Sequence, residues 1–268
     1  MKKPDKFGIW ITQKCPLRCG FCENGDDYFK SGKIMTKDMF EDKVKDIISA
    51  GIKVVDLTPI IGEVLTVPDI GEYLDVLDQY DEIVEYTFIT CLICPSKNID
   101  AISNRPKLSL EISLYGLTPQ EYHQRTNKNV YKSFVNNFKH LISVYRGDVV
   151  IINRTSNPRI KLMERDMSSI MRFLLTKCQI DEQWVDDRDN YTEVMDQKNV
   201  EQFRCHFMSE PLLTDNGICF CCMDWNKSSV IPGKITDMYG DSGEFISKID
   251  SVSDTCNKKC GWYRPPSP

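Results

Sequence analysis

The sequence has no segment long and apolar enough to cross a bilayer. No run approaches the roughly 20 apolar residues that a membrane-spanning helix needs. The apolar stretch 7–12 near the N-terminus is too short to be a secretion signal. We therefore expect a cytoplasmic protein without a membrane partner.

Basic clusters and histidines are also scarce. The net charge is −5 over 268 residues, and Lys and Arg are spread along the chain. This distribution argues against a nucleic-acid partner. The three histidines, His123, His140 and His206, have no ligand spacing among them. A histidine-based metal site is therefore not expected.

Cysteine, in contrast, is abundant, with 12 residues. A chain of this length buries a full core without disulfide staples. Without a secretion signal the chain is expected in a reducing compartment, where thiols serve as ligands for metals or clusters rather than as disulfides.

Strand-like and helix-like segments alternate along the first 190 residues. Short β-branched and apolar runs predict strands, and apolar residues at helical spacing predict helices. The predicted strands are 7–12, 53–57, 83–89, 108–114, 148–153 and a weak sixth strand at 183–186. The predicted helices are one capped by Thr36 and stopped at Gly51, then 69–79, 96–103, 131–145 and 164–177.

Six successive βα units predict a parallel sheet, because parallel neighbours need helical crossovers. Six units are two fewer than a closed barrel of eight strands contains, so we expect an open α/β partial (β/α)6 barrel over residues 1–195. The C-terminal ends of its strands should carry the chemistry. From about Asp196 a cysteine-rich tail follows, with strand-like pieces at 211–215 and 217–223, and we assign 196–268 to a second, small domain.

Three cysteines form the strongest chemical signal. Cys15, Cys19 and Cys22 follow the first predicted strand at C-x3-C-x2-C spacing. Three thiolates on one loop can hold three irons of a 4Fe-4S cluster and leave the fourth iron open, whereas electron-transfer clusters normally have four protein ligands. Zinc is the alternative, but no second thiol hook or histidine lies close by.

This spacing, with Phe21 directly before the third cysteine, resembles the cluster loop of the radical S-adenosylmethionine (radical SAM) enzymes. The resemblance implies that S-adenosylmethionine chelates the open iron. It also implies that an electron from the reduced cluster cleaves this cofactor to methionine and a 5′-deoxyadenosyl radical, which takes a hydrogen atom from the substrate. An electron donor such as flavodoxin or ferredoxin is the implied partner.

Two later segments also resemble motifs of this family. Gly62 and Glu63, with Ile61 in place of a first glycine, are similar to its Gly-Gly-Glu segment, which meets the amino group of the cofactor. Ser113 lies in a segment that is similar to the fourth-strand segment of the family, where it would bind the ribose or carboxylate of the cofactor. An ordinary loop glutamate is the alternative for Glu63.

Three further residues are candidates for cofactor contacts. Arg125 lies near the place of an arginine that pairs with the cofactor carboxylate in the family, one position earlier than usual. Asn153 and Arg154 end the fifth predicted strand. The alternative for Asn153 and Arg154 is a solvated strand end.

The tail cysteines resemble an auxiliary-cluster domain. Cys205, Gly217 and Cys222 are similar to the opening of SPASM domains and of their shortened form, twitch. Cys256 and Cys260 complete four thiolates, enough for a second, fully ligated 4Fe-4S cluster. A SPASM domain needs more cysteines, so we expect a twitch-like domain. Cys219 or Cys221 can replace an assigned ligand, and a structural zinc is the alternative.

Other residues fall on the expected active rim. Asp187, Arg188 and Asn190 follow the sixth predicted strand, where they would bind substrate or act as a base, or else form a solvated turn. Cys91 and Cys94 follow the third strand and are interpreted as buried inert thiols, with a redox pair or hydrogen-atom donor as the alternative.

Three functions are compatible with these features. The layout resembles twitch-bearing radical SAM dehydrogenases, so we predict two-electron oxidation of a small polar substrate with the auxiliary cluster as electron acceptor. Side-chain maturation of a peptide is the second; only 14 residues precede Cys15, so no leader-recognition domain is expected before the barrel. The third is a non-catalytic iron-sulfur electron carrier.

Overall fold

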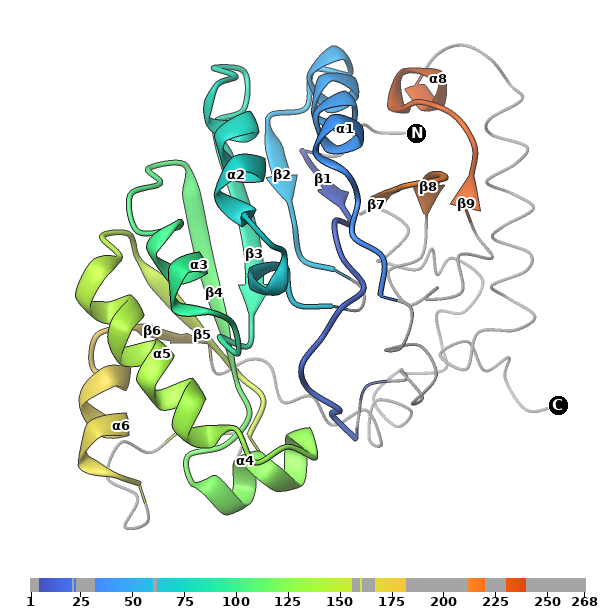
Figure 1. Ribbon diagram of the computed structural model, residues 1–268. Coiled ribbons are helices and arrows are strands. Elements are labelled where there is room, and N and C mark those ends of the chain that lie inside the picture. Colours follow the sequence, from blue (N-terminus) through green and yellow to red (C-terminus); the bar gives the residue numbers. More distant parts are fainter. Residues whose placement is uncertain are drawn as a thin grey trace, which may run out of the picture.

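The computed structural model describes residues 5–20, 22, 32–59, 62–155, 160, 167–181, 212–219 and 230–239. Six strands come first along the chain, and the helices between them lie along one face of the sheet (Figure 1). The strands are β1 (Lys6–Ile9), β2 (Val54–Asp56), β3 (Glu85–Thr90), β4 (Leu108–Leu114), β5 (Val149–Asn153) and β6 (Gln179–Asp181).

The first six strands lie in chain order, and each pairs in parallel with its neighbour. The helices are α1 (Lys37–Ser49), the 3₁₀ helix η2 (Val64–Thr66), α2 (Ile70–Asp78), α3 (Ser96–Asp100), α4 (Pro119–Thr126), α5 (Tyr131–Val144), α6 (Ser169–Leu175) and α8 (Ile235–Tyr239). This α/β arrangement confirms the expected partial barrel. Among the described residues, no helix is long and apolar enough to span a membrane.

The first helix begins where the sequence predicts. The Thr36 hydroxyl accepts a hydrogen bond from the Met39 N–H at 3.3 Å, and Gly51 follows the helix with a left-handed φ of 67°. These two residues satisfy one free N–H at the start and permit the sharp turn at the end.

The core lies between the helices and one face of the sheet. Along β4, Leu108, Leu110 and Ile112 are buried, whereas Ser109 and Glu111 on the other face are half-buried. Successive side chains of a strand point to opposite faces, so the helices cover the apolar side. The opposite, inner face therefore carries polar side chains.

Two elements differ from the prediction. Helix α4 was not expected, although its capping signal is present: Thr118 accepts from the Glu121 N–H at 3.2 Å, and Pro119 is the first helical residue. Its eight residues are mostly polar, so the apolar periodicity is weak. The sixth strand lies at 179–181, directly after α6, and the predicted 183–186 lies outside the described residues.

The tail contributes three strands to the same sheet. Strand β7 (Leu212–Thr214) pairs in parallel with β1, and β8 (Gly217–Cys219) and β9 (Val230–Ile231) follow in antiparallel order. The Trp10 N–H also donates to the Leu213 carbonyl at 2.8 Å. The described strands form one nine-stranded sheet, and a division at residue 195 stays a prediction.

Candidate functional site

The three cysteines of the first motif lie on the loop that leaves the carboxyl end of β1. All three are free thiols of intermediate exposure. Leu17, between the first two, is buried, with 1% of its surface exposed. The Cys22 N–H donates to the Cys19 carbonyl at 3.0 Å. The sequence therefore predicted the place of this loop correctly.

Burial and charge repulsion favour the protonated form of Cys15 and Cys19 when no metal is bound. Burial raises the pKa of Cys15 to about 12, and the Glu63 carboxylate and the Cys22 thiol add to the shift. Burial also raises the pKa of Cys19, while the nearby Arg125 guanidinium opposes this shift. Cationic iron would have to replace these protons, so cluster binding releases protons from the loop.

The donor set fits a 4Fe-4S cluster. Within the described ranges, no three His, Cys, Asp or Glu side chains converge on one metal ion. A cubane does not require such convergence, because each thiolate binds a different iron. Three free thiols on one loop are thus suited to a cluster with one open iron. Phe21, expected beside them, lies outside the described residues.

Glu63 lies in the interior, with 2% of its surface exposed. Its Oε1 accepts from the Thr90 hydroxyl at 2.6 Å and the Leu65 N–H at 3.0 Å, and its Oε2 accepts from the Cys91 N–H at 2.6 Å. The Cys91 thiol also bonds this carboxylate, and burial raises its pKa despite these donors. The carboxylate therefore ties the loops after β2 and β3 together, a role that the motif did not predict.

Gly62 lies against the segment that continues from β1 toward the cysteine loop. It has a φ of +135°, and a Cβ at this position would lie 2.4 Å from the Thr12 carbonyl oxygen. Only glycine fits both the backbone conformation and the close approach. The Glu63 N–H also donates to the Lys14 carbonyl at 2.7 Å, so this segment lies beside the cysteine loop.

The other predicted cofactor contacts lie near the ends of β4 and β5. Ser113 is 3% exposed and hydrogen-bonds Tyr115, whose hydroxyl is within electrostatic range of Cys19. The Arg125 Nε donates to the Arg154 carbonyl at 3.0 Å. Asn153 is fully buried. The structure thus brings Arg125 close to the cysteine loop, whereas Ser113 is linked to that loop through Tyr115.

The Asn153 side chain is engaged locally. Its Oδ1 accepts from both the N–H and the hydroxyl of Thr155, at 3.1 and 2.8 Å. This turn orders the backbone at the end of β5, whose last residue lies in register with Leu114.

Charged residues that the sequence reading missed line the inner face. The Lys6 Nζ lies 2.9 Å from the Asp56 Oδ2, and Glu111 lies within electrostatic range of Asp56, Asp181, Lys6 and Arg154. Burial first, and then the Asp56 and Asp181 carboxylates, raise the pKa of Glu111. The alternation of apolar and polar residues along β4 is the sequence signal that could have identified Glu111.

These charges come from strands that are not neighbours. Lys6 is on β1, Glu111 on β4 and Asp181 on β6. They influence one another because the sheet curves, which encloses a polar inner face. Arg154 also lies near Tyr115, which connects this face electrostatically to Cys19.

A family model described as the Radical SAM superfamily matches residues 9–157, which is more than half of the chain. The chain belongs to the radical SAM superfamily. Membership implies a 4Fe-4S cluster and S-adenosylmethionine as cofactors. Cys15, Cys19 and Cys22 are the described residues that fit such a cluster.

Curated relatives match less than half of this chain. The chain is 31% identical over 131 residues to GTP 3′,8-cyclase of Clostridium perfringens (strain SM101), covering 46% of this chain and 40% of that protein. It is 25% identical over 125 residues to GTP 3′,8-cyclase of Aquifex aeolicus, covering 46% and 38%. The chain thus spans less than half of the length of these relatives.

Among solved structures, SuiB of Streptococcus suis bound to its precursor peptide SuiA has a TM-score of 0.59. The identity is 11%, with 91% of this chain and 66% of that chain covered. At this identity the likeness shows the radical SAM fold alone.

The thiols after β3 do not fit a reactive pair. Cys91 is 5% exposed, and burial raises the pKa of both Cys91 and Cys94. The Asn137 Nδ2 holds their loop by donating to the Leu92 and Cys94 carbonyls at 2.7 and 2.9 Å. Protonated thiols are poor nucleophiles, which disfavours a redox pair. A hydrogen-atom donor is a protonated thiol, so that alternative stays a prediction.

In the tail of this radical SAM chain, the motif glycine is described and most cysteines are not. Gly217 has a φ of +141°, and a Cβ there would lie 2.3 Å from the Ile231 carbonyl oxygen. It therefore permits the β7–β8 turn to pack against β9. Cys219 is fully buried in β8. Outside the described residues lie Cys205, Cys221, Cys222, Cys256, Cys260, Asp187, Arg188 and Asn190.

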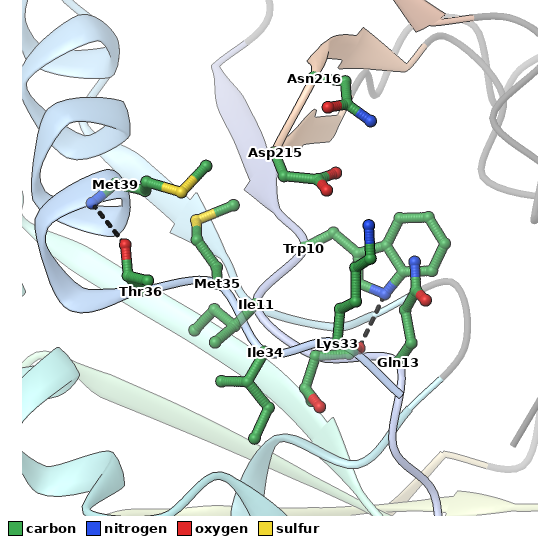
Figure 2. A pocket seen from close by; sticks show the side chains of 11 residues that line it. Trp10, Ile11, Gln13, Lys33, Ile34, Met35, Thr36, Met39, Asp215 and Asn216 are labelled. Atoms are coloured by element: carbon green, nitrogen blue, oxygen red, sulfur yellow. Dashed lines mark hydrogen bonds between the residues drawn. The ribbon is translucent and has the colours of Figure 1, made fainter. Parts of the chain in front are cut away.

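A separate cavity of about 350 Å³ lies beside β1, between the segment leading into α1 and the β7–β8 turn (Figure 2). Lys33, Gln13 and Asp215 are among its polar lining residues. The Trp10 Nε1 donates to the Thr12 carbonyl at 2.8 Å within it. None of the three motif cysteines lines this cavity, so it is distinct from the cluster loop.

Proposed function

We propose that this chain is a radical SAM dehydrogenase that oxidises a small polar substrate. When bound, the cluster and S-adenosylmethionine supply a 5′-deoxyadenosyl radical. The substrate gives a hydrogen atom from carbon to that radical, then a proton to the protein and an electron to a second cluster. The tail cysteines Cys205, Cys222, Cys256 and Cys260 are the proposed ligands of this second cluster.

The charged inner face is the observation that carries the proposal. A face with the half-buried charges of Lys6, Asp56, Glu111 and Asp181 suits hydroxyl or amine groups better than an apolar ligand, because charges shielded from water need polar partners. Within the described part of the chain, the Glu111 carboxylate makes no hydrogen bond or ion pair. Glu111 is therefore the described carboxylate that we propose as the proton acceptor.

The β7–β8 hairpin supports a twitch-like tail. Gly217 occupies the glycine position of the tail motif, and its backbone conformation accounts for the need for glycine. The hairpin pairs with β1, the strand that leads to the first cysteine loop. A second cluster held near this hairpin would thus lie beside the same sheet as the first cluster.

The substrate named for the curated relatives does not establish the substrate of this chain. They are called GTP 3′,8-cyclases, but the match covers about 40% of their length. SuiB was solved with its precursor peptide, so a peptide substrate enters the experiment below as an alternative outcome.

The test is anaerobic cluster reconstitution, followed by incubation with dithionite and S-adenosylmethionine. We expect about eight irons per chain, the sum of two four-iron clusters, together with 5′-deoxyadenosine. Two matched variants separate the sites. Alanine at Cys15, Cys19 and Cys22 should remove about four irons and all cleavage, whereas alanine at Cys256 and Cys260 should remove only the second cluster.

Substrate oxidation is tested with aminocyclitols, a co-encoded peptide and GTP. The dehydrogenase proposal requires 5′-deoxyadenosine and oxidised product in equal amounts, and replacement of dithionite by flavodoxin or ferredoxin should sustain them. Recycling of S-adenosylmethionine, or turnover of only the peptide or GTP, would contradict it. Full cluster loading without cleavage under any of these conditions would favour an electron carrier.

A further inference from the structure

The end of helix α4 contacts the middle of the cysteine loop. The Arg18 N–H donates to the Thr126 carbonyl at 3.0 Å, and the Arg18 carbonyl accepts from the Asn127 Nδ2 at 2.8 Å. The Gly20 N–H donates to the Arg125 carbonyl at 3.3 Å. Three consecutive residues of α4 and its cap thus hold the segment between the first and third cysteines.

The backbone at Asn127 explains why this contact forms. Asn127 ends α4 in the left-handed conformation, with φ 51° and ψ 29°, and its N–H donates to the His123 carbonyl. The last carbonyls of a helix have no partners within the helix, so those of Arg125 and Thr126 are available to the loop. Asparagine tolerates this conformation and, unlike glycine, adds a side-chain donor.

The same turn is also tied to the next strand. The Arg125 Nε donates to the Arg154 carbonyl, directly after β5. Thr126 is fully buried, and its hydroxyl donates to the Tyr122 carbonyl at 2.6 Å. The turn at 125–127 is therefore a fixed support rather than a solvated helix end.

We propose that Asn127 is a positioning residue for the first cluster: through the Arg18 peptide, it holds the Cys15–Cys22 loop in the geometry that retains the cluster. It does not touch the irons itself. Residues that orient metal ligands typically change metal affinity 10–100-fold when they are substituted. The inference depends only on the first cluster, so it stands or falls independently of the dehydrogenase proposal.

Two variants isolate the side-chain donor. Asn127→Gly keeps the left-handed cap and removes the donor, whereas Asn127→Asp keeps the size and turns an acceptor toward the Arg18 carbonyl. Asp69→Gly is the matched control, because Asp69 is also left-handed, with φ 53°, but caps α2 and is exposed.

The measurement is anaerobic loss of iron from the reconstituted full chain to a chelator. Iron loss from the first cluster is one kinetic phase of this measurement. Relative to the wild type, we expect this phase to be about tenfold faster in Asn127→Gly, faster still in Asn127→Asp, and unchanged in Asp69→Gly. The EPR signal of the reduced protein identifies this phase, because S-adenosylmethionine shifts only the signal of a cluster with an open iron. We also expect that shifted signal to broaden in both Asn127 variants.

Thermal unfolding of the metal-free chains provides the structural comparison. The proposal requires unfolding temperatures close to that of the wild type, because the lost contact is exposed. Equal iron-loss rates in all four proteins would overturn it. So would faster loss that merely parallels a lower unfolding temperature of the metal-free chain, with an unaltered EPR signal.

Discussion

The carboxylate of Glu63 accepts a hydrogen bond of 2.6 Å from the backbone N–H of Cys91. This bond joins the loop after β2 to the loop after β3, beside the cysteine loop that leaves β1. Thr90 and Leu65 donate to the other oxygen of the same carboxylate. One buried side chain thus orders two of the loops at the carboxyl ends of the strands.

Replacing Glu63 by glutamine should destabilise the metal-free protein. The amide group would turn a donor toward N–H or O–H groups that now bond a carboxylate. We expect a loss of about 1–3 kcal/mol, because a buried donor that loses its acceptor costs this much. Urea unfolding measures this, with the exposed Glu72→Gln as a control that should change little. A loss equal to that of the control would contradict the assigned network.

Alanine at Gly62 should be poorly tolerated. The added Cβ would meet the Thr12 carbonyl at 2.4 Å, at a φ of +135°. We expect a loss of about 2 kcal/mol or more from strain and displacement of the backbone. Gly71→Ala is the matched control in helix α2, where the nearest atom is 3.4 Å away. That change should be neutral or stabilising by up to about 1 kcal/mol. Similar unfolding midpoints for both variants would refute this contrast.

Glu111→Gln should stabilise the protein at neutral pH and lower its activity. The pKa of Glu111 is raised by burial and by Asp56 and Asp181, so the folded chain holds its proton more tightly than the unfolded chain. Its contribution to stability therefore falls as the pH rises above the unfolded value of about 4.3. The thermal unfolding temperatures of the variant and the wild type should differ at pH 7 and become equal near pH 4. A variant less stable than the wild type at pH 7 would show that Glu111 serves the fold.

The thiols of Cys91 and Cys94 should resist alkylation in the folded protein. Their pKa values are raised by burial, so few thiolates form near pH 8. Mass spectrometry after treatment with iodoacetamide should find both unmodified in native protein and both modified in urea. Rapid labelling, or a disulfide between them after mild oxidation, would instead favour a redox pair.

Local patterns determined much of this molecule. Alternation of apolar runs predicted the first five strands and the helices that follow them, and β4 forms at 108–114 as expected. The sixth strand lies at 179–181 instead of the predicted 183–186. The Thr36 cap and the spacing of Cys15, Cys19 and Cys22 are likewise local, because neighbours in sequence set them. The resemblance of this triplet to the radical SAM cluster loop agrees with the match of the family model.

Contacts between distant segments were decided only by the tertiary structure. The sequence does not show that Asn127 binds the Arg18 peptide, 109 positions away, or that β7 pairs with β1. Nor does it show that Glu63 bonds Cys91 rather than remaining in an open loop. Every residue except proline has the same backbone N–H group, so a sequence does not show which N–H a given carboxylate will accept from. Burial and the curvature of the sheet decide these pairs. Spacing along the chain thus predicted the ligands of the cluster loop, whereas the fold determined what holds that loop in place.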